Sequence, residues 1–569
     1  MSDTLAAEVI ATNERLDGDR VTWLEHWQRV AQLVITNRSD YIVQKTPGQR
    51  REQYVYDATA VFANEQLAAQ LHSQLTSDSL LWAQWRCEDD RLNDDDDCRL
   101  WLDAASRAAF AIYSGTRHNF SVAAHELYLD VASIGSGCMA VLESERNGIV
   151  FSTRHMKECC WEENEEGRVD LLSRKWSWTA KQAYQAWGEA AGEMVCKAAM
   201  DPKEQTRQFT FVHEVQPRRD RDPTRWDARN KPFRSVYVCR ESKHVVAESG
   251  FNEFPYMCPR LSKVSGEKYG RGRGMAMLPF IATLNEMVRT IMKAAQKIVD
   301  PPILLPDDGF LVPLKQSPGA LNYYRAGMRD EAKPLHTGGD IQLGRELLND
   351  TRQLVMRGFY NDWFTMPSDP SDPSSDGKGI TATYTLRDRD EKMQLASPLL
   401  GRMRCEWLGP LNDRVLAIMW RQSAMRRFGP GSLLPPPPAK LSGAKLRAEY
   451  LSPIAIAQRS SQMEGMSRLI QIATMLAQAN PQRAPAIMSI LDDDAIMRIA
   501  GRDLNTPAAA LKSPERLAAE AQAQAQAEAE MNAHAQALAQ GKALQAGGAG
   551  IKSLADAAGG AGGQLQEAA

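Results

Sequence analysis

The chain has 569 residues, of which 43% are hydrophobic and 24% charged, and its formal net charge is −3. The length excludes a single small domain and predicts two to four structural units. The balanced charge excludes a generic polyanion binder, because such proteins carry a basic excess that neutralises phosphates. The nine cysteines include no C-x-x-C pair, which favours reduced thiols over a zinc site or a disulfide framework.

The sequence contains no segment typical of membrane insertion or export. Its first twenty residues are acidic and lack an apolar core, so we expect no signal peptide. No run of eighteen apolar residues occurs, so we expect no membrane-spanning helix and no membrane partner. These features predict a soluble protein that is intracellular at synthesis.

The first 135 residues are predicted to be mostly helical. Apolar residues recur there at three- and four-residue intervals over 21–35, 55–76, 97–115 and 121–137. The acidic run from Asp94 to Asp97 lies between two of these segments. We interpret it as helix-capping residues in a solvated loop, because no second cluster of metal ligands lies nearby.

A β-rich block follows, from about residue 138 to 265. Short runs rich in Val, Phe, Tyr and Trp are separated by turn residues: CMAVLESE, GIVFSTRH, RVDLLSRKWSW, FTFVHEV and SVYVCRES. One helix is predicted within the block, over 179–199. The order of these elements predicts an α+β protein that is predominantly helical.

A long amphipathic helix is predicted over 276–299. It follows Gly270, Gly272 and Gly274, which we interpret as a hinge. Apolar residues step by four and three along the helix and form a heptad-like seam: Met277, Ile281, Leu284, Val288, Ile291, Ala295 and Ile298. A basic row lies off that seam and contains Arg289, Lys293 and Lys297.

The long helix is predicted to have a return partner. Residues 300–339 hold several prolines and short apolar pieces, which predict a small β-like insertion, and a second helix is expected over 340–364. A loop of Pro, Ser, Asp and Gly covers 365–384. The two helices are therefore predicted to run in opposite directions, as an antiparallel pair joined by the insertion.

The remaining third of the chain is predicted to be helical and then of low complexity. A long helical region over 385–428 is expected to bend near Pro398 and Pro410. A proline-rich linker leads to an all-helical unit over 449–505. From residue 513 the composition collapses to Ala, Gln, Glu and Gly, for which we expect partial helix and a disordered end.

The sequence lacks the usual motifs of enzymes. SSDGKGI is not a phosphate-binding loop, because the upstream glycine and the following Ser or Thr are missing. His125-Glu126 lacks the second histidine of a zinc protease, and IGSGC lacks the frame of a nucleophile elbow. We therefore expect no enzyme activity, no catalytic residue, no cofactor and no metal.

Three segments carry a likeness to a known family: residues 56–85, 266–304 and 448–471. With the order of the parts, they resemble the portal, or head-to-tail connector, of T7-like short-tailed bacteriophages. The middle segment is the most specific, because its glycines and its Pro301-Pro302 exit both match the family pattern. The likeness covers roughly residues 20–510, and the Ala/Gln/Gly tail departs from it.

The resemblance implies a portal architecture in a dodecameric ring. Its parts would be a wing over 1–275, stem helices over 276–299 and 340–364, a clip over 300–339, a tunnel loop over 365–384, the wing's long helix and linker over 385–435, a crown over 445–510 and a tail over 513–569. We expect the apolar seam to pack against neighbouring copies in that ring, because a lone amphipathic rod cannot bury its stripe.

The resemblance also implies a function and partners. The ring would form the channel at one capsid vertex through which double-stranded DNA is packaged and ejected. It would dock the large subunit of terminase and later the tail adaptor and tail tube proteins, and it would contact the major capsid and scaffolding proteins. The protein would be assembled in the cytoplasm of a host bacterium and reside at the portal vertex of the virion.

Candidate contact residues follow from these implied roles. Basic residues that could line the channel are Lys293, Lys297, Arg345, Arg352 and Lys378. An alternative left open is that they face solvent or pair with a neighbouring subunit. Candidates for docking partners at the clip lie within 306–327 and are Phe310, Lys315, Tyr323, Tyr324 and Arg325.

Two other functions are alternatives to the portal. A cellular helical scaffold or adaptor predicts an internal period of about 30–45 residues, and none is found in this sequence. A metal-dependent nuclease predicts acidic residues on neighbouring strands, whereas the Asp runs fall in predicted loops.

Overall fold

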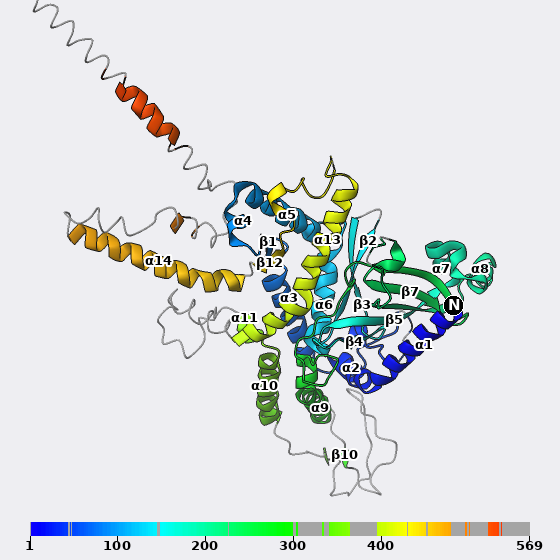
Figure 1. Ribbon diagram of the computed structural model, residues 1–569. Coiled ribbons are helices and arrows are strands. Elements are labelled where there is room, and N and C mark those ends of the chain that lie inside the picture. The colour runs from blue at the N-terminus through cyan, green and yellow to red at the C-terminus, as the bar shows by residue number, and fades with distance from the viewer. Residues whose placement is uncertain are drawn as a thin grey trace, which may run out of the picture. The chain divides into compact units, whose positions relative to one another are not determined.

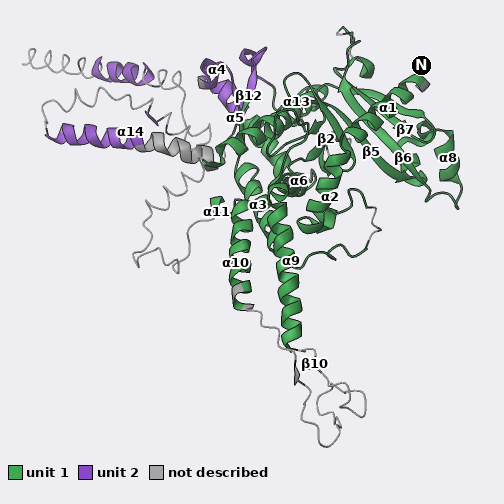
Figure 2. Cartoon of the chain, turned by 90° about the horizontal axis from the view of Figure 1, so that it is seen from below, with its two compact units in different colours: residues 1–85, 104–436, 448–462 green, residues 86–103, 437–447, 463–569 purple. Residues whose placement is uncertain are grey.

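The computed structural model of the chain describes residues 2–43, 46, 48–144, 148–222, 224–225, 227–299, 303–304, 333–334, 341–364, 395–429, 431–450 and 453–479, together with short helical pieces between 496 and 536. The chain divides into two compact units (Figure 2). Unit 1 comprises residues 1–85, 104–436 and 448–462, and unit 2 comprises 86–103, 437–447 and 463–569. Helices and antiparallel sheets are both present, and the predicted α+β class is confirmed.

The first part of unit 1 is helical. Its helices are α1 (Ser2–Asp19), α2 (Val21–Leu33), α3 (Thr59–Leu75) and α6 (Phe120–Ile134), while α5 (Asp96–Ser114) runs from unit 2 into unit 1. The helix α6 stops at Gly135, whose φ of 84° is a left-handed conformation that glycine adopts without strain.

A five-stranded antiparallel sheet forms the centre of the β-rich block, in the order β4-β5-β6-β7-β8. Its strands are β4 (Cys159–Glu163), β5 (Val169–Thr179), β6 (Gln208–Pro217), β7 (Phe233–Cys239) and β8 (His244–Phe251). Because side chains alternate along a strand, Phe209 and Phe211 of β6 face one side and Val212 the other. Val212 packs on α1, whereas Phe209 and Phe211 pack on α7 and α8, so helices cover both faces (Figure 1).

The helix predicted over 179–199 is divided into three pieces, so this prediction was wrong. The structure has α7 (Ala180–Trp187), the 3-10 turn η2 (Gly188–Ala191) and α8 (Glu193–Met200). Gly188 and Gly192 have φ of 57° and 96°, which no continuous right-handed helix can contain. Thr179 and Gln182 form a capping box at the start of α7.

A smaller sheet has the order β3-β2-β9, and its strand β2 contacts the long helix over 395–425. Its strands are β2 (Cys138–Ser144), β3 (Gly148–Arg154) and β9 (Tyr256–Met257). The long helix comprises helical residues 395–403, a π-helical turn, η4 (Arg404–Leu408), and α13 (Gly409–Met425). The π turn ends two residues before Pro410, which cannot donate a backbone hydrogen bond.

A helical hairpin of α9 (Arg273–Val299) and α10 (Ile341–Gly358), called the hairpin below, completes the described core of unit 1. The two helices lie side by side (Figure 1). The short helix α11 (Asn361–Phe364) follows α10. Between α9 and α10, only a pair of two-residue strands is described, β10 (Ile303–Leu304) and β11 (Lys333–Pro334).

Unit 2 contains α4 (Asp90–Asp94), the first turns of α5, the 3-10 turn η5 (Ala439–Leu441) and most of α14 (Pro453–Ala479). The side chain of Asp95 accepts a hydrogen bond from the backbone amide of Cys98 at 3.2 Å and pairs with Lys440. This part of the predicted acidic run therefore caps a helix. Two strands, β1 (Ala83–Cys87) and β12 (Leu446–Tyr450), pair with each other. None of the helices in the described part of the chain could span a lipid bilayer.

Candidate functional site

The base of the hairpin is a close crossing of two backbone segments, and it requires glycine. A Cβ atom on Gly270 would overlap the carbonyl oxygen of Gly135, and one on Gly272 would overlap that of Ser133. The amide of Gly270 donates to the hydroxyl oxygen of Ser136 at 2.8 Å. These glycines let the start of α9 lie directly on the end of α6. Their role as a hinge stays a prediction.

Glycines also set the contact between the two helices of the hairpin. A Cβ atom on Gly344 would lie 3.4 Å from Cδ1 of Ile291, and one on Gly358 would overlap the side chain of Met277. The two contacts are separated by fourteen residues on α9 (277 to 291) and by fourteen residues on α10 (344 to 358), in the opposite order. The helices are therefore antiparallel and keep a constant spacing along their length.

The burial of α9 falls from its base to its far end. Ile281 and Leu284 are each only 1% exposed, whereas Met292, Ile298 and Val299 are 53%, 52% and 85% exposed. The covering elements at the base are α2, α3, α6 and α10 of the same chain. The expectation that the whole seam packs against neighbouring copies was therefore wrong for Ile281 and Leu284, because helices of the same chain already bury them.

Two polar contacts fix the base of the hairpin to the segment before α3. The side-chain oxygen of Asn285 accepts the backbone amides of Tyr56 at 2.8 Å and Asp57 at 3.2 Å. The guanidinium of Arg352 donates two hydrogen bonds to one carboxylate oxygen of Asp57, at 2.9 and 2.7 Å. Burial opposes ionisation of Asp57, but the hydrogen bonds from Thr59 and Arg352 outweigh it and lower its pKa.

A third polar contact joins the two helices of the hairpin, α9 and α10, to each other. Nε of Arg273, in the first turn of α9, donates to the carbonyl oxygen of Gly358 at 2.7 Å. Its guanidinium also lies 4.0 Å from the ring centroid of Tyr360. Arg273 therefore satisfies a carbonyl group at the C-terminal end of α10 that the helix itself cannot pair.

The structure places the predicted channel residues in different settings. Lys293 and Lys297 are exposed on the outer half of α9, and Arg345 is exposed near the start of α10. Arg352 forms an ion pair with Asp57 and is only partly exposed. Lys378 lies outside the described residues, as do all five predicted clip residues, Phe310, Lys315, Tyr323, Tyr324 and Arg325.

Sequence reasoning missed the most buried ionic contact near the hairpin. Arg260 is 1% exposed and donates through Nε and Nη2 to the two carboxylate oxygens of Glu406, at 2.9 and 2.8 Å. It also pairs with Glu163 of β4. Because Glu406 belongs to the π turn η4, this arginine joins the long helix to the five-stranded sheet. Its only signal in the sequence is a charged residue directly after a proline, which is not specific.

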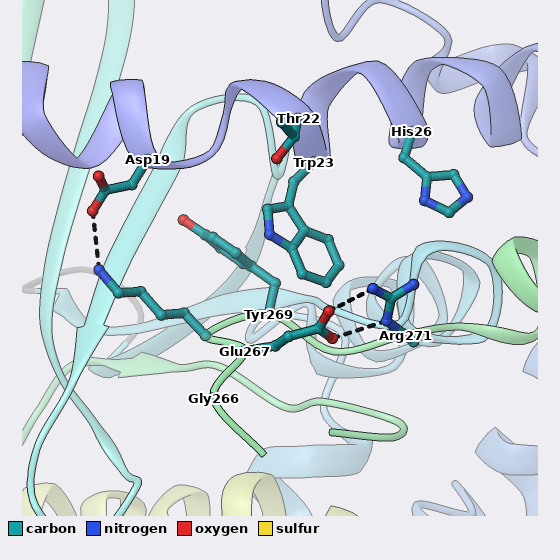
Figure 3. Close-up of a pocket in the computed structure, with 9 residues that line it drawn as sticks. Asp19, Thr22, Trp23, His26, Gly266, Glu267, Tyr269 and Arg271 are labelled. Atoms are coloured by element: carbon teal, nitrogen blue, oxygen red, sulfur yellow. Dashed lines mark hydrogen bonds and ion pairs between the residues drawn. The ribbon is translucent and has the colours of Figure 1, made fainter. Parts of the chain in front are cut away.

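A pocket of about 440 Å³ lies between α2 and residues 266–271, just before α9 (Figure 3). Lys268 pairs with Asp19 at 3.0 Å and Arg271 pairs with Glu267, so the charges in its wall compensate one another. The Arg271 guanidinium lies 5.3 Å from the ring centroid of Trp23. The pocket therefore lies beside the base of the hairpin, and its charged side chains pair with one another. It is not a strongly charged ligand site.

The described residues contain no group of three or more His, Cys, Asp or Glu side chains placed to hold a metal ion. The cysteines of the described chain are all free thiols, and seven of the nine are buried. The candidate functional site is the hairpin, with its locked base and exposed outer half.

Comparisons with known proteins identify the family of this chain. A family described as "Bacteriophage head to tail connecting protein" matches residues 6–511. The probable portal protein of Bordetella phage BPP-1 is 25% identical over 473 residues, which cover 82% of each chain. The portal protein of Salmonella phage epsilon15 is 25% identical over 492 residues, which cover 85% of each chain.

A solved chain titled "Virion of native gene transfer agent (GTA) particle" gives a TM-score of 0.26 at 9% identity, covering 77% of this chain and 94% of the other. A likeness of that size carries no argument. The two phage relatives do not single out the T7-like type, so only the broader assignment is confirmed. The chain belongs to the family of bacteriophage head to tail connecting proteins, the structural portal proteins of the virion.

Proposed function

We propose that twelve copies of this chain form a ring whose stem is the hairpin, around a channel for double-stranded DNA of a short-tailed, T7-like phage. The family supports a ring that connects head and tail. The observation that carries the proposal is the burial gradient along α9, from 1% exposed at Ile281 to 85% at Val299. A helix locked at one end and exposed at the other can hold the segment 300–339 away from the protein body.

The partners follow the order of assembly. The segment 300–339 docks the large terminase subunit while DNA enters, and later the tail adaptor and tail tube proteins. The wing contacts the major capsid and scaffolding proteins in the host cytoplasm, where the vertex is assembled. The parts of the proposal that concern the clip, the tunnel loop over 365–384 and the tail over 513–569 rest on the sequence, because these residues lie almost wholly outside the described ones.

The charge of the chain supports a conduit rather than a tight DNA binder. With a net charge of −3, the ring has no basic excess to hold the phosphates of passing DNA. Lys293, Lys297 and Arg345 are exposed and available for sparse contacts, whereas Arg352 is paired within the chain. Lys378 remains a proposed contact on the tunnel loop.

Electron microscopy of the purified full chain tests the ring directly. We expect annular particles with a central hole wide enough for a DNA duplex. A chain that stays monomeric under all conditions tried would overturn the proposal.

Two deletions test the proposed parts of the ring. Removal of 306–327 should leave rings intact and abolish terminase or tail attachment, whereas removal of 367–379 should leave rings intact and reduce DNA packaging or retention. Loss of rings in the first case, or a normal genome load in the second, would contradict the assigned roles.

A further inference from the structure

A second cavity of unit 1 lies beside the π turn η4 and the turn that joins β4 to β5. Its volume is about 300 Å³, at the lower end of the range of about 300–1,000 Å³ for small-molecule sites. Its wall includes three aromatic residues, Phe233, Phe254 and Tyr256, together with Cys405 and Glu406 of η4. π turns frequently occur at functional sites. The roles proposed above for the chain do not use this cavity.

The aromatic residues of the wall form one group. The ring of Phe254 lies 5.5 Å from that of Phe233 and 6.2 Å from that of Tyr256, measured between centroids. The hydroxyl oxygen of Tyr256 lies 2.7 Å from Nδ1 of His213, so this polar group is already paired. A ligand in the cavity can therefore contact the rings themselves. Aromatic rings bind apolar groups, and their faces also attract cations.

Asp170 lines the same cavity, at an irregularity in β5. In the register of the two strands, Glu162 pairs with Leu171 and Glu163 with Val169, so Asp170 is an extra residue without a partner. Such a β-bulge redirects a side chain from the regular alternation of a strand. Burial raises the pKa of the Asp170 carboxyl group and the nearby Glu162 adds to this rise, while a hydrogen bond from the backbone of Asp170 opposes it.

The other charged side chains in the wall have partners within the chain. Arg168 lies 3.8 Å from Glu166, and Arg260 donates to both carboxylate oxygens of Glu406. Asp170 forms no ion pair with any residue that the structure describes. Because burial disfavours a carboxylate that has no cation beside it, a bound cation would stabilise this group. The cavity thus combines aromatic rings with one uncompensated carboxylate.

From these observations we propose that the cavity binds a small organic cation, a protonated amine carried on an apolar body. The ammonium group pairs with the carboxylate of Asp170, and the apolar body packs on Phe233 and Phe254. A neutral ligand leaves the carboxylate without a cation, and an anion is repelled by it. The volume equals that of about ten water molecules at ~30 Å³ each, which is enough for one aryl or alkyl amine.

Cys405 provides a direct measure of occupancy in the full chain. It lines the cavity and is the exposed one of the nine cysteines. Benzylammonium, which has a ring and a charged group, should slow the alkylation of Cys405 by N-ethylmaleimide about fivefold or more, as measured by peptide mass spectrometry. Cys196 of α8 is partly buried and does not line the cavity, so its alkylation rate should stay unchanged in the same sample.

A neutral ligand and two variants test the role of the charge. Benzyl alcohol has the same ring without the cation and should need at least tenfold higher concentration for equal protection of Cys405. Asp170→Asn keeps the size of the side chain and should weaken protection by benzylammonium at least tenfold. Glu166→Gln removes an exposed carboxylate from the same wall and should change it less than twofold. Circular dichroism checks that both variants are folded.

The cation can be a free amine or the lysine side chain of another protein, and a second probe separates these sources. Stronger protection by benzylammonium than by Nα-acetyl-lysine amide supports a free amine, whereas the reverse order supports a lysine side chain. No protection by either cation, equal protection by benzyl alcohol and benzylammonium, or full protection in folded Asp170→Asn would overturn the proposal.

Discussion

The five-stranded sheet and the hairpin both carry apolar faces, but helices of the same chain cover both faces of the sheet. On the sheet, α1 covers one face and α7 with α8 cover the other. On the hairpin, the chain covers the base of α9 and leaves Phe280, Ile298, Leu347 and Leu354 exposed. The difference fits the proposed ring, in which another copy would cover the exposed residues of the hairpin. Substitutions in the two regions should therefore affect stability and assembly separately.

The largest effect is expected at the arginine that joins the sheet to the long helix. Arg260→Met removes the cation that Glu406 and Glu163 share in a buried site and should lower the free energy of unfolding by about 3–5 kcal/mol. Chemical denaturation followed by tryptophan fluorescence measures the loss. The exposed pair of Arg15 with Glu162 provides the control, since Arg15→Met should cost about 1 kcal/mol or less. Equal losses from both variants would show that Arg260 is not a structural junction.

The next largest effect on stability is expected at the base of the hairpin, and a much smaller one at its outer half. Leu284→Ala should reduce the free energy of unfolding by about 2–5 kcal/mol, because it leaves a cavity among helices that remain in place. Ile298→Ala, on the same helix but half exposed, should change it by about 0.5 kcal/mol or less. Its effect should appear in ring formation instead. If Ile298→Ala destabilised the monomer as much as Leu284→Ala, the burial gradient would be wrong.

A pH dependence is expected from the sheet at Glu214. Burial raises the pKa of this carboxyl group to about 7, with Arg234 opposing the shift and Glu8 adding to it. Between its ordinary value of 4.5 and about 7, the unfolded chain releases the proton while the folded chain keeps it, so stability falls as the pH rises. Glu214→Gln removes this loss and should gain up to ~3 kcal/mol over the wild type at pH 8.

Thermal unfolding of wild type and Glu214→Gln at pH 5 and pH 8 measures this difference. The gain should be small at pH 5 and larger at pH 8. Glu14→Gln, at an exposed position on α1 that pairs with Arg240, is the matched Glu-to-Gln control. A constant difference at the two pH values would contradict the buried, protonated state of Glu214.

The smallest effect distinguishes a structural arginine from a free one on the same helix. Arg352→Gln removes the ion pair with Asp57 and should cost about 1 kcal/mol, a value held down by the partial exposure of Arg352. Arg345→Gln should leave stability within about 0.5 kcal/mol, and as a proposed channel contact it should alter DNA passage alone. Denaturation midpoints and packaging assays with both variants sharpen the comparison. A larger packaging defect for Arg352→Gln, without loss of stability, would reverse the two roles.

The sequence was sufficient for features with a local physical cause. Seven-residue apolar spacing predicted the long helix over 276–299, and the structure has α9 over Arg273–Val299. Short runs rich in Val, Phe, Tyr and Trp predicted five strand segments, and the family predicted from segment order and motifs is confirmed at the level of phage portal proteins. Local pattern failed over 179–199, where two glycines with positive φ interrupt a sequence of helical composition.

Tertiary structure alone decided which residues of one pattern are buried. Leu284 and Ile298 occupy equivalent positions in the same seam, yet one is enclosed by α2, α3, α6 and α10 and the other is open. Periodicity defines a face of a helix, but the neighbours of that face come from segments hundreds of residues away in the chain. The ion pairs of Arg352 with Asp57 and of Arg260 with Glu406 could not be predicted from the sequence either. An ion pair depends on distance in space, and its two residues need not recur at any fixed spacing in the sequence.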